Sequence, residues 1–241
     1  MFEGSVNVIK WSVGHAGILL HRFFQKVQEI ESGLGKGLCF DAGPDTSRFV
    51  SGEYEHPVQE AIQSLVNPGD VCYDIGANLG FFSVLLGRLV GPEGTVYAFE
   101  PVPTNVTMIE RNARLNDLGN IRVMQLALTR TDGEAELLLA RHVGGAVLKD
   151  AGTPPDLAGK LTVQTAAVDS LLARRDIKPP RLVKIDVEGA EMDVLLGMER
   201  TLRNHSPVVL LELDDAIQSE CERKVSECRR FLEGLGYRRT E

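Results

Sequence analysis

The chain lacks a surplus of positive charge and lacks any long apolar run. Lys and Arg number 26 against 34 Asp and Glu, which leaves a formal net charge of −8. Nucleic-acid-binding proteins usually carry a basic face, so we expect no nucleic-acid partner. No apolar run approaches the ~20 residues that span a bilayer, and no charged N-terminal region leads into an apolar core and a cleavage site. The sequence therefore predicts neither a membrane span nor a secretory signal.

Cysteine is scarce, and its spacing suggests no pairing. Cys39, Cys72, Cys221 and Cys228 form no C-x-x-C motif and have no nearby His partner. We therefore expect neither a zinc site nor a redox pair. Buried free thiols are the better interpretation, and free thiols are typical of a reducing compartment. On this ground we expect a cytoplasmic protein.

Apolar runs alternate with helical patterns along most of the chain. The runs cover residues 71–76, 95–100, 121–128, 182–187 and 207–213, and the helical patterns cover 78–90, 103–116, 190–203 and 217–234. Two further strands are expected at ELLLA and LTVQTAAV. Strands that alternate with helices predict an α/β fold with a mostly parallel sheet and right-handed crossovers. The length of 241 residues suits one such domain.

The segment VCYDIGANLGFF, residues 71–82, carries the most informative motif. A strand end, a turn and a helix start follow one another at Asp74, Gly76, Ala77, Asn78 and Gly80. Gly76 has no Cβ, so it can adopt a positive φ and let ligand atoms approach the main chain. A loop of this kind predicts a site for a nucleoside-like cofactor.

An acid closes the next apolar run, TVYAFEP. Glu100 lies 24 residues beyond Gly76 (100 minus 76), about where an α/β nucleotide fold places a carboxylate on ribose hydroxyls. We expect this carboxylate to stay partly wet at its strand end. A dinucleotide site would need G-x-G-x-x-G, but Asn78 occupies the middle position here and the spacing is G-x-x-x-G.

Two acids beside a glycine turn suit a cationic ligand without phosphate, such as S-adenosylmethionine. An NAD-dependent oxidoreductase remains an alternative because it shares the glycine turn and the ribose acid. A non-catalytic nucleoside-binding protein of the same fold is a third reading. An ordinary strand–Gly–helix junction of an α/β protein would also produce such a loop.

A second group of acids gathers in VKIDVEGAE, residues 183–191. Asp186 ends an apolar strand, and Glu188, Glu191 and Glu212 are expected near the same strand end. Asp186 could act as a general base on an acceptor hydroxyl, orient a methyl donor, or join its neighbours around magnesium. Lys184 is expected to pair with one of these acids, and the structural alternative is a buried Lys–Glu pair plus acids that favour a helix N-terminus.

The alternation of strands and helices breaks between residues 129 and 180. A polar segment that contains Gly and Pro, residues 141–160, lies between the two further strand candidates. Long irregular segments are often binding loops, so we assign this one to the acceptor substrate. A surface excursion without function is the alternative. His142 in this segment is a second candidate base.

Residues 1–50 precede the motifs and are expected to form a helical or irregular extension. Residues 16–30 repeat apolar positions at helical spacing. Three roles are open to such a helix: covering the core, pairing with a second subunit in a homodimer, or resting on a membrane surface.

Taken in order, the motifs resemble the FkbM family of S-adenosylmethionine-dependent methyltransferases. The resemblance rests on Tyr54-Glu55, PGDVCYDIGANLGFFSVLLG, YAFEPVPTNVTMIERNARLN, VMQLALTRTDGEAEL and VDSLL before LVKIDVEGAEMDVLLG. It covers about residues 52–237 and implies a methyltransferase domain over 51–241. It also implies a Rossmann-like class I methyltransferase fold, with a mostly parallel central sheet and helices on both faces. The implied reaction is O-methylation of a hydroxyl on a small molecule or glycan, and we expect the reaction to need no metal.

The resemblance also implies roles for individual positions. The methionine part of the donor would border on Asp74, Gly76, Asn78 and Gly80, with Ala77 and Phe81 beside them. Glu100 would take the ribose hydroxyls, Pro101 and Asn105 would flank the adenosine pocket, and Leu126 and Ala127 would line the adenine edge. Gln125 stands where many methyltransferases prefer an acid. Asp186 would face the transferable methyl group as the catalytic residue.

Overall fold

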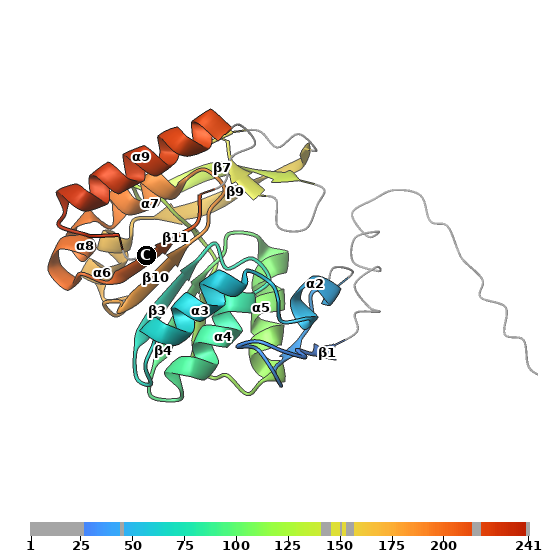
Figure 1. Ribbon diagram of the computed structural model, residues 1–241. Coiled ribbons are helices and arrows are strands. Elements are labelled where there is room, and N and C mark those ends of the chain that lie inside the picture. The colour runs from blue at the N-terminus through green and yellow to red at the C-terminus, as the bar shows by residue number, and fades with distance from the viewer. Residues whose placement is uncertain are drawn as a thin grey trace, which may run out of the picture.

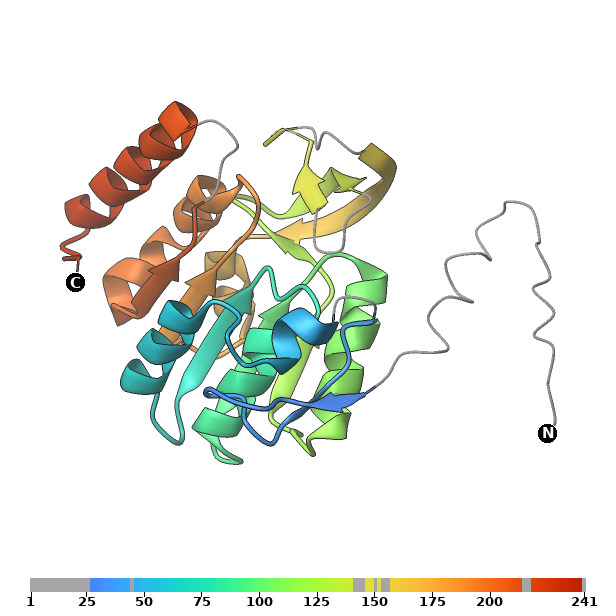
Figure 2. The ribbon, with the colours of Figure 1, turned by 45° about the vertical axis from the view of Figure 1, so that its right-hand side comes forward.

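The structure is a computed structural model that describes residues 27–43, 46–140, 146–149, 151–152, 157–213 and 218–239. Helices cover both faces of a central sheet, and a smaller sheet stands beside it (Figures 1 and 2). The N-terminal elements lie with the helices of one face, and the long C-terminal helix lies over the other.

The central sheet has five parallel strands in the order β11-β10-β3-β4-β5. Their bounds are β3 Val71–Ile75, β4 Thr95–Phe99, β5 Ile121–Met124, β10 Leu182–Ile185 and β11 Val208–Leu211. The predicted parallel α/β sheet is confirmed. The chain runs outward from β3 through β4 to β5, then returns to build β10 and β11 on the other side of β3. In such sheets ligands bind where the strand order reverses, which is between β3 and β10.

The strand side chains alternate between two cores. Cys72 of β3 packs against the helices of one face, α3 His56–Leu65, α4 Phe81–Val90 and α5 Pro103–Leu115. Its neighbour Tyr73 packs on the opposite face against α6 Val168–Arg174, α7 Glu191–Gly197, α8 Glu199–His205 and α9 Gln218–Gly234. Because both faces are covered, the strands read as nearly continuous apolar runs. The helix predicted at 190–203 is divided at Met198 into α7 and α8.

The segment before the motifs is built into the core. Strands β1 Gln28–Glu29 and β2 Cys39–Phe40 pair antiparallel, and helix α2 Thr46–Val50 follows. Asn116, just after α5, hydrogen-bonds both main-chain polar groups of Cys39 at 2.7 Å, and Asn112 of α5 does the same for Asp41 at 2.9 and 3.0 Å. The two side-chain amides thus make the main-chain hydrogen bonds that a neighbouring strand would make with this segment. The domain boundary at residue 50 stays a prediction.

The expected helix over residues 16–30 is wrong at its C-terminal end. Residues 28–29 form β1, and Ile30 is fully buried among the core residues of the first face. A turn over 32–37 reverses the chain so that β2 can pair with β1, and this long-range pairing overrides the local helical spacing. Residues 16–26 lie outside the described residues.

A second sheet of four strands, in the order β6-β9-β7-β8, follows the central β5 strand. It contains β6 Ala127–Leu128, β7 Gly133–Ala140, β8 Ala146–Leu148 and β9 Leu157–Ala166. The two further strands are therefore confirmed, and the run predicted at 121–128 is divided between the sheets. The segment expected to be irregular contains β8 and the start of β9, because both pair with β7. Within the described residues, no helix is long and apolar enough to cross a membrane.

Candidate functional site

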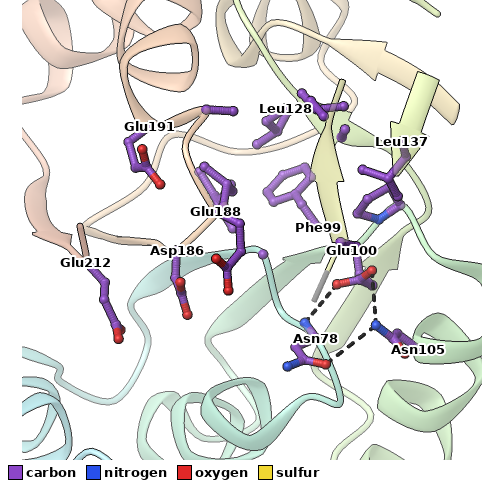
Figure 3. Close-up of a pocket in the computed structure, with 18 of the residues that line it drawn as sticks. Asn78, Phe99, Glu100, Asn105, Leu128, Leu137, Asp186, Glu188, Glu191 and Glu212 are labelled. Carbon is purple, nitrogen blue, oxygen red and sulfur yellow. Dashed lines mark hydrogen bonds between the residues drawn. The ribbon is translucent and has the colours of Figure 1, made fainter. Parts of the chain in front are cut away.

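A cavity of about 300 Å³ opens at the carboxyl ends of β3, β4, β10 and β11. This volume is at the lower end of the usual range for small-molecule sites. The cavity coincides with the reversal of strand order between β3 and β10. In Figure 3, Asp186, Glu188 and Glu212 point into one part of it, while Glu100 lies across from them with Asn78 and Asn105. Leu137 and Leu148 of the second sheet complete the wall.

The loop after β3 is shaped by its contact with the loop after β10. Gly76 has a φ of 78°, and a Cβ there would overlap the carbonyl oxygen of Asp186. The amide N–H of Asp186 donates to the carbonyl of Ile75 at 3.0 Å, so the two loops are joined through their main chains. The need for glycine was predicted, but the neighbour is protein backbone. Asn78 also adopts a positive φ, of 50°, where it lines the cavity.

The predicted donor residues separate into two groups. One group lines the cavity: Gly76, Asn78, Glu100, Pro101, Asn105, Leu126 and Ala127. The other group lies behind the wall or in the core: Asp74, Ala77, Gly80 and Phe81. Phe81 packs edge-on against Phe40 and Tyr54. Whether any of these residues contacts a donor stays a prediction.

Asp74 is a buried acid beneath the loop. Its side chain is 1% exposed, and the Ser83 hydroxyl donates to its Oδ2 at 2.6 Å. Burial raises the pKa of Asp74, and the charge of Lys184 and the Ser83 hydrogen bond oppose that rise. Asp74 therefore belongs to the support of the loop in this structure.

Glu100 holds two loops together at the end of β4. Its Oε2 accepts the amide N–H of Asn78 and its Oε1 accepts that of Val102, both at 2.9 Å (Figure 3 draws the bond from Asn78). Asn105 Nδ2 lies 3.4 Å from Oε1. Only 5% of the residue is exposed, so the expectation of a partly wet group is wrong. Burial raises the pKa of Glu100 to about 7 against these three hydrogen bonds.

Asp186 shares the opposite end of the cavity with a buried cation. Lys184 Nζ lies 3.0 Å from Asp186 Oδ2, and the side chains are 4% and 33% exposed. The ammonium also lies 4.7 Å from the centre of the Phe82 ring. Burial acts to lower the pKa of Lys184, but the charges of Asp186 and Asp74 exceed it and raise that pKa overall. The Lys–acid pair foreseen from the sequence is therefore present, with Asp186 as the partner.

The neighbouring glutamates are held in different ways. Glu191 Oε1 accepts the amide N–H of Gly189 at 2.7 Å at the start of α7, and burial raises its pKa. Glu212 follows β11, and its N–H donates to the Ile185 carbonyl at 2.9 Å. Burial, followed by the charge of Asp186, raises the pKa of Glu212 to about 7. In the described part of the chain, no three His, Cys, Asp or Glu side chains could hold a metal ion together.

Sequence analysis gave no site role to several residues that line the cavity, and three of them come from the N-terminal part of the described chain. Arg48, Tyr54 and Glu55 come from α2 and from the turn that precedes α3. The Arg48 guanidinium lies 4.8 Å from the centre of the Tyr54 ring. The Tyr54-Glu55 pair entered only through the family resemblance, and no local pattern marks Arg48. Their place at the cavity depends on how residues 27–50 pack against α4 and α5. His142 lies outside the described residues.

Residues 74–239 match the family described as the methyltransferase FkbM domain. The chain belongs to the FkbM methyltransferase family. Methyltransferase 1 of Beauveria bassiana is 29% identical over 61% of this chain and 70% of its own length. The 31-O-demethyl-FK506 methyltransferase FkbM of Streptomyces tacrolimicus is 30% identical, over 56% and 61%. The hexuronic acid methyltransferase AglP of Haloferax volcanii is 26% identical, over 58% and 55%. The matched regions thus span little more than half of two of these relatives.

Solved methyltransferase structures also resemble the chain. A methyltransferase FkbM from Methylobacillus flagellatus matches 70% of this chain and 43% of its own, with 16% identity and a TM-score of 0.42. A precorrin-6Y C5,15-methyltransferase from Geobacter metallireducens matches 76% and 72%, with 17% identity and a TM-score of 0.48. Both scores lie below 0.5. The Rossmann-like class I methyltransferase fold is established instead by the strand order and by the family match.

Proposed function

We propose that this chain is an S-adenosylmethionine-dependent O-methyltransferase that acts on a hydroxyl of a small molecule or glycan. The observation that carries the proposal is a cavity at the reversal of strand order, with Glu100 at one end and a group of carboxylates at the other. Three relatives support transfer to oxygen. They are named as a 31-O-demethyl-FK506 methyltransferase, a hexuronic acid methyltransferase and a 2-O-methyltransferase.

The chemistry of the cavity suits a donor that is cationic and carries a nucleoside. In this proposal Glu100 accepts the ribose hydroxyls, while Pro101, Asn105, Leu126 and Ala127 border the adenosine. Gly76 and Asn78 lie toward the methionine part. The residues behind the wall, Asp74, Ala77, Gly80 and Phe81, act by fixing the shape of the loop. Glu188 and Glu191, which follow β10 and line the cavity, complement the ammonium and sulfonium groups of the donor.

Asp186 is the proposed catalytic residue on the acceptor side. The donor supplies an activated methyl group, so the protein has to orient the acceptor hydroxyl and provide for its proton. Asp186 extends into the cavity from the end of β10, and Lys184 fixes its carboxylate. We propose that this carboxylate accepts a hydrogen bond from the acceptor hydroxyl, with no metal required.

The family assignment favours a methyl donor over NAD, which the sequence left as an alternative. Titration calorimetry with S-adenosylhomocysteine and, separately, NAD tests the donor. We expect binding of S-adenosylhomocysteine only. Binding of NAD without a response to S-adenosylhomocysteine would overturn the proposal.

The acceptor is tested with deuterated S-adenosylmethionine and three hydroxyl compounds: a hexuronic acid glycoside, a neutral glycoside and 31-O-demethyl-FK506. Mass spectrometry should detect a deuterated methyl ether on at least one of them. A non-catalytic nucleoside-binding protein would bind S-adenosylhomocysteine and methylate none of the three.

A further inference from the structure

Glu55 and Glu212 bring two carboxyl groups together at the acidic end of the cavity. Glu55 caps the N-terminus of α3 and Glu212 follows β11, so the two come from opposite ends of the chain. Both line the cavity. The Oε2 atom of each is buried, and the described residues offer neither atom a hydrogen-bond donor. A proton on Glu212 would give the two carboxyl groups the hydrogen bond that these oxygens lack.

The surroundings of the pair oppose a second negative charge. Burial and the charges of Asp186 and Glu55 act on Glu212 in the same direction, and the nearby Lys184 only partly offsets them. The Tyr54 hydroxyl also hydrogen-bonds Glu55, and burial together with this bond raises the pKa of Tyr54. One proton shared by Glu55 and Glu212 removes the repulsion between them, as in other carboxyl pairs.

Glu55 has an unfavourable backbone conformation. Its φ is 45°, in the left-handed region that residues with a Cβ rarely adopt. Asn78 and Glu188, which line the same cavity, also have positive φ values of 50° and 51°. Strained main-chain positions of this kind tend to cluster where a protein binds or transforms a ligand.

We propose that Glu55 and Glu212 form a carboxyl pair that holds one shared proton in its protonated form, and that the pair in its proton-free form takes, through Glu212, the proton released by the acceptor hydroxyl during methyl transfer. This inference rests on the proposed function. Asp186 is less suited to receive that proton, because its Oδ2 is paired with the Lys184 ammonium at 3.0 Å. Asp186 orients the hydroxyl, Glu212 receives the proton, and Glu55 is a positioning residue that sets the basicity of Glu212.

The step balances without a further reactant. The acceptor oxygen bonds to the methyl carbon, the carbon–sulfur electron pair stays on sulfur, and the hydroxyl proton passes to the ionised pair. The best base for this step titrates near the working pH. Besides Glu55, the charged groups that shift the pKa of Glu212 are Asp186 and Lys184, at the end of β10. Arg48 and Glu188 line the same cavity.

The shared proton is tested without any acceptor, by thermal unfolding of the ligand-free protein between pH 5 and 8.5. The wild-type Tm should fall as pH rises through about 7, because the raised pKa of Glu212 means that the native state loses stability on ionisation. Glu212→Gln should have a Tm about 2–4 °C above wild type at pH 8.5, allowing for solvent screening, and no such gain at pH 5.

The double variant Glu55→Gln/Glu212→Gln should gain no more than one single variant, because either substitution removes the repulsion. Glu93→Gln, in an exposed turn at the opposite edge of the sheet from the cavity, is the matched control and should leave the pH dependence unchanged. The shared proton would be refuted if the two cavity substitutions had additive effects on Tm, or if they lowered Tm equally at every pH.

The base role is tested with the acceptor that is methylated in the panel above. Glu212→Gln should lower turnover about 10²- to 10⁴-fold, while its Kd for S-adenosylhomocysteine changes less than about 3-fold. Glu55→Gln should lower turnover less than Glu212→Gln does and should move the acidic limb of the kcat profile to lower pH. Full turnover in Glu212→Gln would refute this role and leave the proposed function intact. If the wild-type protein did not bind S-adenosylhomocysteine, the proposed function itself would be refuted.

Discussion

Binding of S-adenosylhomocysteine should tighten as pH rises from 6 to 8, because Glu100 must be ionised to accept the ribose hydroxyls. The pKa of Glu100 is raised to about 7. The carboxyl group is then roughly one-tenth ionised at pH 6 and roughly nine-tenths ionised at pH 8. We therefore expect Kd to be about 10-fold weaker at pH 6, equivalent to about 1.4 kcal/mol.

Titration calorimetry in two buffers of different ionisation enthalpy gives both the Kd and the number of protons released on binding. Near pH 6.5 the protein should release more than half a proton per ligand bound, because the ligand favours the ionised carboxylate. Glu100→Gln should weaken binding at least about 10-fold at pH 8, through loss of charge-assisted hydrogen bonds, and should also abolish the pH dependence. Glu212→Gln is the matched control and should retain it. A pH-independent Kd, or the same slope in Glu100→Gln, would refute the ribose role.

The same group has an opposite effect on the ligand-free protein. Because the folded pKa lies above the ordinary value of 4.5, the contribution of Glu100 to stability is fully present below about pH 4.5 and is lost as pH rises through about 7. The full shift corresponds to at most about 3 kcal/mol. Urea unfolding of Glu100→Gln should therefore depend less on pH than unfolding of wild type over this window.

Three further variants test the frame of the site. Gly76→Ala should cost at least about 3 kcal/mol in urea unfolding, because its Cβ meets the Asp186 carbonyl, whereas Gly69→Ala, also at positive φ but in open space, should cost only about 1 kcal/mol. Lys184→Met should cost about 3–5 kcal/mol by leaving the buried Asp74 and the partly exposed Asp186 without their cation; a loss below about 1 kcal/mol would contradict this. Asp186→Asn should lower turnover about 10²-fold or more with nearly unchanged S-adenosylhomocysteine binding, and EDTA should leave wild-type turnover intact. Restoration by magnesium of activity lost in EDTA would assign Asp186 to a metal site.

Local patterns in the sequence determined the parallel sheet and the two acidic loops. Apolar runs that alternate with helical spacing predicted the five strands of the central sheet, since this periodicity reflects burial of strands on both faces. The position of acids just after apolar runs placed Glu100 and Asp186 at one edge of that sheet, because parallel strands end on the same side. The sequence also predicted that Lys184 pairs with one of the nearby acids, and only the structure gave Asp186 as the partner.

Tertiary structure decided which groups meet across the cavity and how buried they are. Glu55 and Arg48 reach it only because residues 27–50 pack on the helices of one face, through contacts such as those of Asn112 with Asp41 across 71 positions of sequence. Glu100 is buried because two loops donate main-chain N–H groups to it, and Gly76 is required because a neighbouring loop occupies the space of a side chain. These features depend on contacts between distant segments, which local periodicity and spacing do not encode.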